Sequence, residues 1–129
     1  MTQRRRYRRK PDKYVVAVQL NLDTAGFTYR KWGGEQHCKP GDWLVDNAGE
    51  VYTVDAASFA RTYRQLRPGV YLKTTPVWAA ASAADGAVPT KEGRTAHAAG
   101  DYVVSNNEDG SDGYAVAADT FHELYELDE

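Results

Sequence analysis

The sequence predicts an α+β protein made of two small repeats, each a meander of about four β-strands closed by one short helix. A chain of 129 residues with 42% hydrophobic and 12% aromatic residues can supply the core of one ordinary domain or two very small ones. One order of landmarks also occurs twice, within residues 38–63 and again within residues 97–125. A repeat of about 50 residues buries little alone, so we expect repeats at 14–66 and 67–129 to pack with pseudo-twofold symmetry.

The two repeats align in one order with a single small insertion. An offset of 59 residues pairs Val18 with Val77, Gly34 with Gly93, Gly41 with Gly100, Asp42 with Asp101, Trp43 with Tyr102, Val45 with Val104 and Asn47 with Asn106. After the longer segment "NNEDGSDG", an offset of 62 pairs Tyr52 with Tyr114, Val54 with Val116, Ala56 with Ala118, Phe59 with Phe121 and Tyr63 with Tyr125. Most of these positions are turn glycines or core-type side chains, which indicates an internal duplication.

The first repeat contains four segments typical of strands. They are "YVVAVQL" (14–20), "GFTYRKW" (26–32), "DWLV" (42–45) and "EVYTV" (50–54), separated by turn residues. The period then changes, because Asp55 is a good N-cap and Phe59 and Tyr63 are four residues apart. We therefore expect a short helix whose aromatic face covers the sheet.

The second repeat follows the same order. Strands are expected within "TTPVWAA" (74–80), "AVPTK" (87–91), "DYVV" (101–104) and "GYAV" (113–116), followed by a helix from Ala118 to Tyr125. Pro89 places the second of these strands at an edge, because proline cannot donate to a β-ladder.

Composition excludes several classes of protein. The longest uncharged apolar run, residues 76–84, is too short to span a bilayer, and the arginine-rich start lacks the apolar region of a signal peptide. A single cysteine, Cys38, excludes an internal disulfide and any multi-cysteine metal site. We therefore expect a cytoplasmic protein that makes no membrane contact and needs no cofactor or metal.

Charge is distributed unevenly along the chain. Residues 1–13 hold seven of the 16 basic residues, whereas nine acidic and no basic residues follow Arg94. Blocks of like charge do not fold by themselves, so residues 1–13 are expected to form a flexible basic arm whose loss would leave the melting temperature almost unchanged. In the alternative, the arm folds back onto the acidic second half and stabilises it at low salt.

The block "PGDWLV…GEVYTVDAASFARTY" resembles the PGDYG family of small bacterial and phage domains. The matching residues are Pro40, Gly41, Asp42, Trp43, Leu44, Val45, Gly49, Glu50, Tyr52, Val54, Phe59 and Tyr63. The resemblance covers residues 14–66. The second copy departs from it, because Ala99 stands opposite Pro40 and a longer loop replaces the Gly-Glu turn. The resemblance implies a domain in a bacterial or phage protein and supplies no mechanism.

Duplication would make Asp42 and Asp101 a pseudo-symmetric pair of carboxylates. Such a pair could share a proton, hold a cation or accept hydrogen bonds from a ligand. Each aspartate could instead cap its own turn by accepting a backbone N–H bond. Cys38 beside His37 suggests a thiol nucleophile, yet neighbours on a strand point to opposite faces. His97, aligned with Cys38, is a better geometric partner, and a small buried thiol is the simpler interpretation.

Three functions remain open at this point. The first is a non-enzymatic module that binds a protein or a small anionic ligand at the seam between the repeats, through Lys39, Asp42 and Asp101, with Trp43 and Tyr102 as aromatic walls and Trp32 lining a groove. The second is weak, sequence-independent contact of the arm with nucleic acid. The residues of that site would be Arg4, Arg5, Arg6, Tyr7, Arg8, Arg9 and Lys10. The third is a hydrolase or transferase that uses Asp42, His37 or Cys38.

Overall fold

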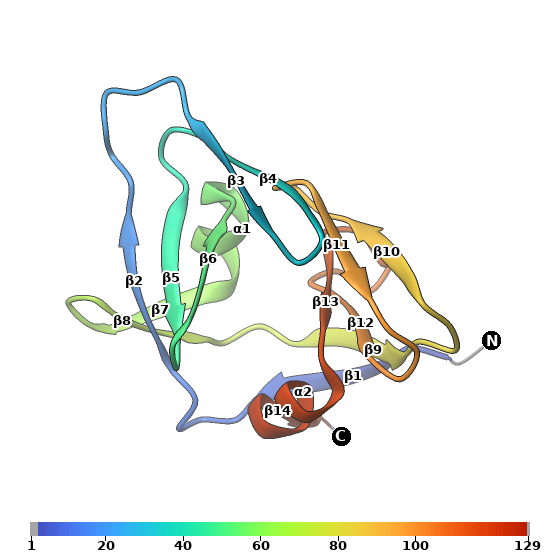
Figure 1. Cartoon of the computed structure of the whole chain (residues 1–129). Helices are drawn as coiled ribbons and strands as arrows, with labels where there is room; N and C mark the ends of the chain where they lie inside the picture. The colour runs from blue at the N-terminus through green and yellow to red at the C-terminus, as the bar shows by residue number, and fades with distance from the viewer. Residues whose placement is uncertain (1–2, 129) are drawn as a thin grey trace.

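The computed structural model describes residues 3–128 and contains two five-stranded antiparallel sheets, two separate two-stranded hairpins and two short helices (Figure 1). The α+β class expected from the sequence is confirmed, with strands outweighing helices. Within these residues no helix is long and apolar enough to cross a membrane.

The first sheet is built from residues 15–73. Its strands, in order across the sheet, are β6 (Glu50–Val54), β5 (Trp43–Asn47), β2 (Val15–Gln19), β8 (Val70–Lys73) and β7 (Tyr63–Arg67). Helix α1 (Ala56–Thr62) follows β6, and Asp55 caps it by accepting a bond from the Ser58 N–H, as its N-cap position predicts. Strands β3 (Phe27–Lys31) and β4 (Gly34–Cys38) form a hairpin outside the sheet.

The second sheet uses both ends of the chain. Its strands, in order, are β13 (Gly113–Val116), β12 (Tyr102–Ser105), β9 (Val77–Ala81), β1 (Arg5–Arg9) and β14 (Tyr125–Leu127). Helix α2 (Ala118–Leu124) follows β13, and β10 (Gly86–Pro89) pairs with β11 (Arg94–His97) as a hairpin. The element order therefore follows that of the first sheet, except that β1 occupies the place that β8 takes there.

The expected meander is wrong in detail. Strand β2 pairs with β5 and β8, while β3 pairs only with β4, so the chain leaves the sheet after β2 and returns at β5. Strands β7 and β8 were not expected, because the exposed polar side chains of "YRQLR" give β7 no apolar alternation. Each sheet is therefore larger than a four-stranded meander.

The expectation of a flexible basic arm is also wrong. Strand β1 lies between β9 and β14, with Tyr7 opposite both Val77 and Leu127. The arginines are accommodated because Arg8 pairs with Glu126 at 2.8 Å and Arg6 with Asp128 at 3.2 Å. The alternative, in which the basic segment folds back onto the acidic second half, is confirmed.

Each sheet carries its own aromatic core. In the first half, Phe59 is stacked between Trp43 and Tyr63, with centroid distances of 4.1 and 4.5 Å. The second half repeats this arrangement with rings whose centroids are 4.1 and 5.0 Å apart. Those rings are Tyr102, Phe121 and Tyr125. Phe59, Phe121 and Tyr125 are buried as expected, and Tyr63 is half-buried.

The proposed pairing of Val18 with Val77 is wrong. Val77 is fully buried in the second core, whereas Val18 is 55% exposed on the outer face of the first sheet. Val15 is the buried residue that corresponds to Val77. It lies two residues before Ala17, which pairs with Val45, just as Val77 lies two residues before Ala79, which pairs with Val104. The offset between the first strands of the two halves is therefore 62, as it is at the ends of the halves.

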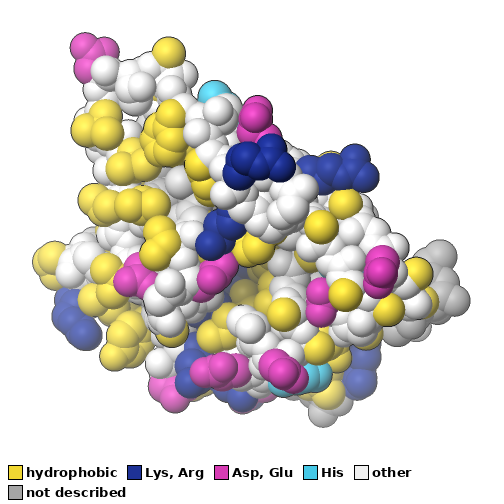
Figure 2. Space-filling model, viewed as in Figure 1, with side chains coloured by type: hydrophobic (Ala, Val, Ile, Leu, Met, Phe, Trp, Pro, Cys, Tyr) yellow, Lys and Arg dark blue, Asp and Glu magenta, His cyan; other side chains and the backbone are white. Residues whose placement is uncertain are grey.

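The outer face of the first sheet is apolar and open. Val16, Val18, Leu44 and Val51 are each at least 36% exposed. Figure 2 shows apolar side chains gathered on this part of the molecule, over β2 and β5. Strand β2 therefore has apolar side chains on both its buried and its exposed face. For this reason the apolar pattern of the sequence does not show which face is buried.

Candidate functional site: a cavity between the two sheets

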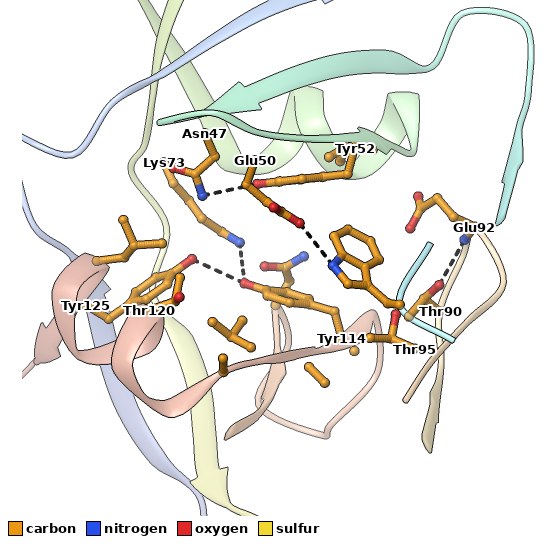
Figure 3. Close-up of a pocket in the computed structure, with 18 of the residues that line it drawn as sticks. Asn47, Glu50, Tyr52, Lys73, Thr90, Glu92, Thr95, Tyr114, Thr120 and Tyr125 are labelled. Atoms are coloured by element: carbon orange, nitrogen blue, oxygen red, sulfur yellow. Dashed lines mark hydrogen bonds between the residues drawn. The ribbon is translucent and has the colours of Figure 1, made fainter. Parts of the chain in front are cut away.

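A cavity of about 590 Å³ lies where the two sheets face each other (Figure 3). Its size is within the range of small-molecule sites. The first half contributes Asn47, Tyr52, Tyr63 and Lys73, and the second sheet contributes Arg9, Tyr114 and Tyr125. The wall thus depends on both sheets, and neither half could form it alone.

Two buried cations, Lys73 and Arg9, form one end of this cavity. Each residue is 6% exposed. The Lys73 Nζ donates to the Tyr114 hydroxyl at 3.0 Å, and the Arg9 guanidinium donates to Asn47 Oδ1 at 2.9 Å. Within residues 3–128, neither cation has a carboxylate at ion-pair distance. This cationic end therefore carries positive charge that no described carboxylate neutralises by an ion pair.

The surrounding tyrosines respond to these charges. Burial lowers the pKa of Lys73 and raises that of Tyr52 to about 12. For Tyr125, burial alone would raise the pKa, but attraction to Lys73 and Arg9 outweighs it and lowers the value. The Tyr125 hydroxyl lies 3.3 Å from that of Tyr114. At the Tyr125 hydroxyl the two cations therefore outweigh burial, whereas burial raises the pKa of Tyr63 and of Tyr114 beside it.

Glu92 lies at the other end of the cavity. Figure 3 shows Lys73 and Tyr125 on one side of the cavity and Glu92 with Thr90 on the opposite side. The Asp55 N–H donates to the Glu92 carboxylate at 2.8 Å. Burial nevertheless raises the pKa of Glu92 to about 6, despite this bond and the nearby charge of Lys39. The cavity therefore has a cationic and an acidic end.

Replacing Glu92 with glutamine is expected to stabilise the protein at neutral pH by about 1–2 kcal/mol. Because the folded-state pKa is raised from 4.5 to about 6, folding binds a proton between these values, and stability is lost as pH rises through about 6. The glutamine side chain would keep an oxygen for the Asp55 N–H and would not titrate. Urea unfolding of E92Q and the parent should give nearly equal stabilities below pH 4.5, diverge between pH 4.5 and about 6, and keep a constant difference above that; a difference that does not change across this range would contradict the assignment.

Trp32 forms an aromatic wall at the mouth of the cavity. It lies in the two-residue turn of the β3–β4 hairpin, where both Trp32 and Gly33 have positive φ, 55° and 76°. A bulky residue in this conformation is strained by about 1 kcal/mol or more. The indole lies 5.5 Å from the Tyr52 ring and donates to Glu50 at 3.1 Å. Of the aromatic residues predicted at the seam, Trp32 is the one that lines the cavity.

The other predicted seam residues have structural roles. Asp42 is 1% exposed and accepts bonds from the backbone N–H groups of Lys39 and Ala56. Asp101 accepts a bond from the Ala98 N–H at 2.9 Å, the equivalent bond in the second half. Each aspartate thus caps its own turn, which is the structural alternative for this pair; a shared ligand site of the two carboxylates stays a prediction. Trp43 and Tyr102 belong to the aromatic stacks and are not cavity walls.

Lys39 supports the capping network around α1. Its Nζ lies 3.1 Å from both Asp42 Oδ2 and Asp55 Oδ1. Because both of these acids already engage its ammonium group, the role of Lys39 is to hold the turn and the helix start together.

The nucleophile expected from Cys38 and His37 is not assembled. Cys38 is 2% exposed, and burial raises the pKa of its thiol, which opposes the reactive thiolate. His37 is exposed on the opposite face of β4, as strand geometry predicts. Asp42 is occupied as a cap. Within the described chain, no group of three or more His, Cys, Asp or Glu side chains could hold a metal ion.

Sequence reasoning missed the cationic end of the cavity, although a signal for it exists. Aligning "RRRYRRK" with "PGVYLKT" at an offset of 64 pairs Tyr7 with Tyr71 and Arg9 with Lys73. Tyr71 contacts Phe59 edge-on at 5.1 Å, and Tyr7 contacts Phe121 edge-on at 4.8 Å. This pairing links the first residues of the chain to the end of the first half, which an alignment starting at residue 14 cannot find.

No family model, curated protein or solved structure matches the chain. The resemblance of residues 14–66 to PGDYG domains therefore stays a prediction. What the protein does has to be argued from the cavity and its charges.

Proposed function

We propose that the protein is a non-enzymatic binding module that takes a small anionic ligand into the cavity between its two sheets. The observation that carries this proposal is the pair of buried cations, Lys73 and Arg9, whose charge no described carboxylate neutralises. Burying a charge without a counter-ion costs several kcal/mol, so such groups are typical of sites that bind an opposite charge. Tyrosine hydroxyls beside them would orient the bound group.

We also propose that the two halves are an internal duplication related by a pseudo-twofold axis. Three features support this: the strand orders correspond, the aromatic stacks repeat, and Arg9 and Lys73 occupy corresponding strands, β1 and β8. Duplication explains why equivalent tyrosines from both halves meet at the seam. The resemblance to PGDYG domains supports a bacterial or phage origin, and the single cysteine a cytoplasmic location.

Contact with nucleic acid through residues 4–10 receives less support. Two of the arginines that would neutralise phosphates, Arg6 and Arg8, are already paired with acids of β14 and the residue after it, and Arg9 points into the protein. A phosphate backbone would have to compete with these pairs, so the seam cavity is the better candidate for binding.

Replacing Lys73 with methionine is expected to weaken anion binding at least about 10-fold and to raise the stability of the empty protein by about 1–2 kcal/mol. Methionine fills a similar volume and removes the cost of a buried charge. Calorimetric titration and thermal melts with a panel of small carboxylates and phosphates would measure both effects. Lys10→Met, at a lysine outside the cavity wall, is the matched control. Binding to Lys73→Met at parental affinity would overturn the proposal.

A further inference from the structure

We infer that the ligand of this cavity is zwitterionic, carrying an amino group that binds Glu92 in addition to an anionic group that binds Lys73 and Arg9. This inference rests on the proposed function and specifies the chemical class of its ligand. The two ends of the cavity differ in charge, and they lie on opposite sides in Figure 3. A ligand with charges of both signs would match both ends at once.

Glu92 is available for an amino group because its neighbours are already engaged. Lys39, whose charge acts on Glu92, and Lys91, the sequence neighbour of Glu92, both bind the Asp55 carboxylate, at 3.1 and 3.5 Å. Lys91 also donates to Ser58 Oγ at 2.9 Å. Within residues 3–128, Glu92 has no cation at ion-pair distance and receives the Asp55 N–H. Asp55 thus takes both lysines and leaves the Glu92 carboxylate without a counter-ion.

The other acidic residues of the cavity wall are occupied. Glu50 pairs with Lys31 at 3.1 Å, Asp112 with Arg61 at 3.0 Å and Glu123 with Lys13 at 4.0 Å. Asp101 caps its turn. Among the described wall residues, Glu92 and Asp101 are thus the acids without an ion pair, and Glu92 is the one that Figure 3 places opposite Lys73.

Between the two ends the wall carries Glu50, whose charge is already paired with Lys31, together with uncharged polar and aromatic groups. It includes Thr53, Thr62 and Thr95, all buried, and the Tyr52 ring against which Trp32 packs. Such a lining accommodates a neutral spacer of carbon atoms or an aromatic ring between the charged groups. A doubly anionic ligand would instead place a negative charge near Glu92, which like-charge repulsion disfavours.

The test compares pairs of probes that differ only in the amino group. The full chain is titrated with unbranched alkanoates and ω-amino alkanoates of about four to eight carbon atoms, the range that a cavity of this size admits. Calorimetry gives the affinity, and the Trp32 indole N–H signal in NMR reports occupancy of the cavity. We expect the amino compound of the best length to bind about 10-fold more tightly than its alkanoate partner, the effect of one charged hydrogen bond.

Variants assign this preference to its residues. Glu92→Gln should reduce the affinity ratio between the two compounds to about one, whereas Glu35→Gln, at an exposed acid on β4, should keep it. Equal binding of the two compounds by the parent, or a preference that survives in Glu92→Gln, would overturn the zwitterion inference and leave the proposed anion site standing. If neither these probes nor the wider panel of carboxylates and phosphates binds, both proposals fail.

Discussion

Deleting residues 1–10 is expected to lower the free energy of unfolding by at least about 5 kcal/mol, enough to unfold the second sheet. The segment contains β1, which pairs with β9 on one side and β14 on the other, so its loss breaks the sheet in two. Tyr7 would also be lost from its contacts with Phe121 and Tyr102, at 4.8 and 6.3 Å between ring centroids. A flexible tail would show no such effect.

Salt separates this packing role from a purely electrostatic one. The side chains of Arg6 and Arg8 are exposed, so solvent and salt screen their pairs with Asp128 and Glu126, and these pairs contribute little to stability. The loss of stability should therefore persist at about 1 M salt, where such pairs are screened. Circular dichroism melts at low and high salt measure this, and Arg6→Gln with Arg8→Gln is the control that removes the pairs but keeps the strand.

A synthetic peptide of residues 1–13 provides the complementary test. Added to the truncated protein, it should restore the folded signal by inserting between β9 and β14. A truncated protein that melts at the parental temperature would show that β1 is dispensable to the fold.

The structure explains why most strands are predictable from sequence and β1 is not. Segments such as "EVYTV" are predictable because turn residues bound them and β-branched and aromatic residues fill them. Strand β1 has a pattern of alternating faces too, with Tyr7 and Arg9 inward and Arg8 outward. From sequence, however, Arg9 is expected to be exposed to solvent, because arginine is rarely buried. The local sequence does not show that tyrosines distant in the chain surround it.

The sequence indicates where a binding site could lie, but it does not indicate which residues line the cavity. The duplication predicted from the sequence implies a seam between the repeats, and such a seam is a reasonable place for a ligand. The repeated aspartates were the obvious candidates because they match in sequence, yet turn capping accounts for Asp42 and Asp101. The cations that line the cavity, Lys73 and Arg9, differ in residue type and lie in strands that occupy corresponding places, β8 from the middle of the chain and β1 from its start. Tertiary topology, which no local pattern encodes, brings them together.

Replacing Phe59 or Phe121 with alanine is expected to cost about 3–5 kcal/mol of stability. Each ring is at most 2% exposed and is stacked between two other aromatic rings, so truncation leaves a cavity that rigid neighbours cannot fill. The chain's third phenylalanine, Phe27, is 45% exposed and is the matched control, with an expected cost below about 1 kcal/mol. Urea unfolding monitored by tryptophan fluorescence gives all three values.

The same two variants examine whether the halves unfold as one unit. Ser58 and Arg61 of α1 both bind Asp112 of the second half, at 2.8 and 3.0 Å, so the halves are joined by more than the chain. We therefore expect Phe59→Ala and Phe121→Ala each to shift one shared transition, seen alike by circular dichroism and fluorescence. Two separated transitions, with only one moving in each variant, would show that the halves are independent. Costs as small as that of Phe27→Ala would show that the two stacks are not the cores of the sheets.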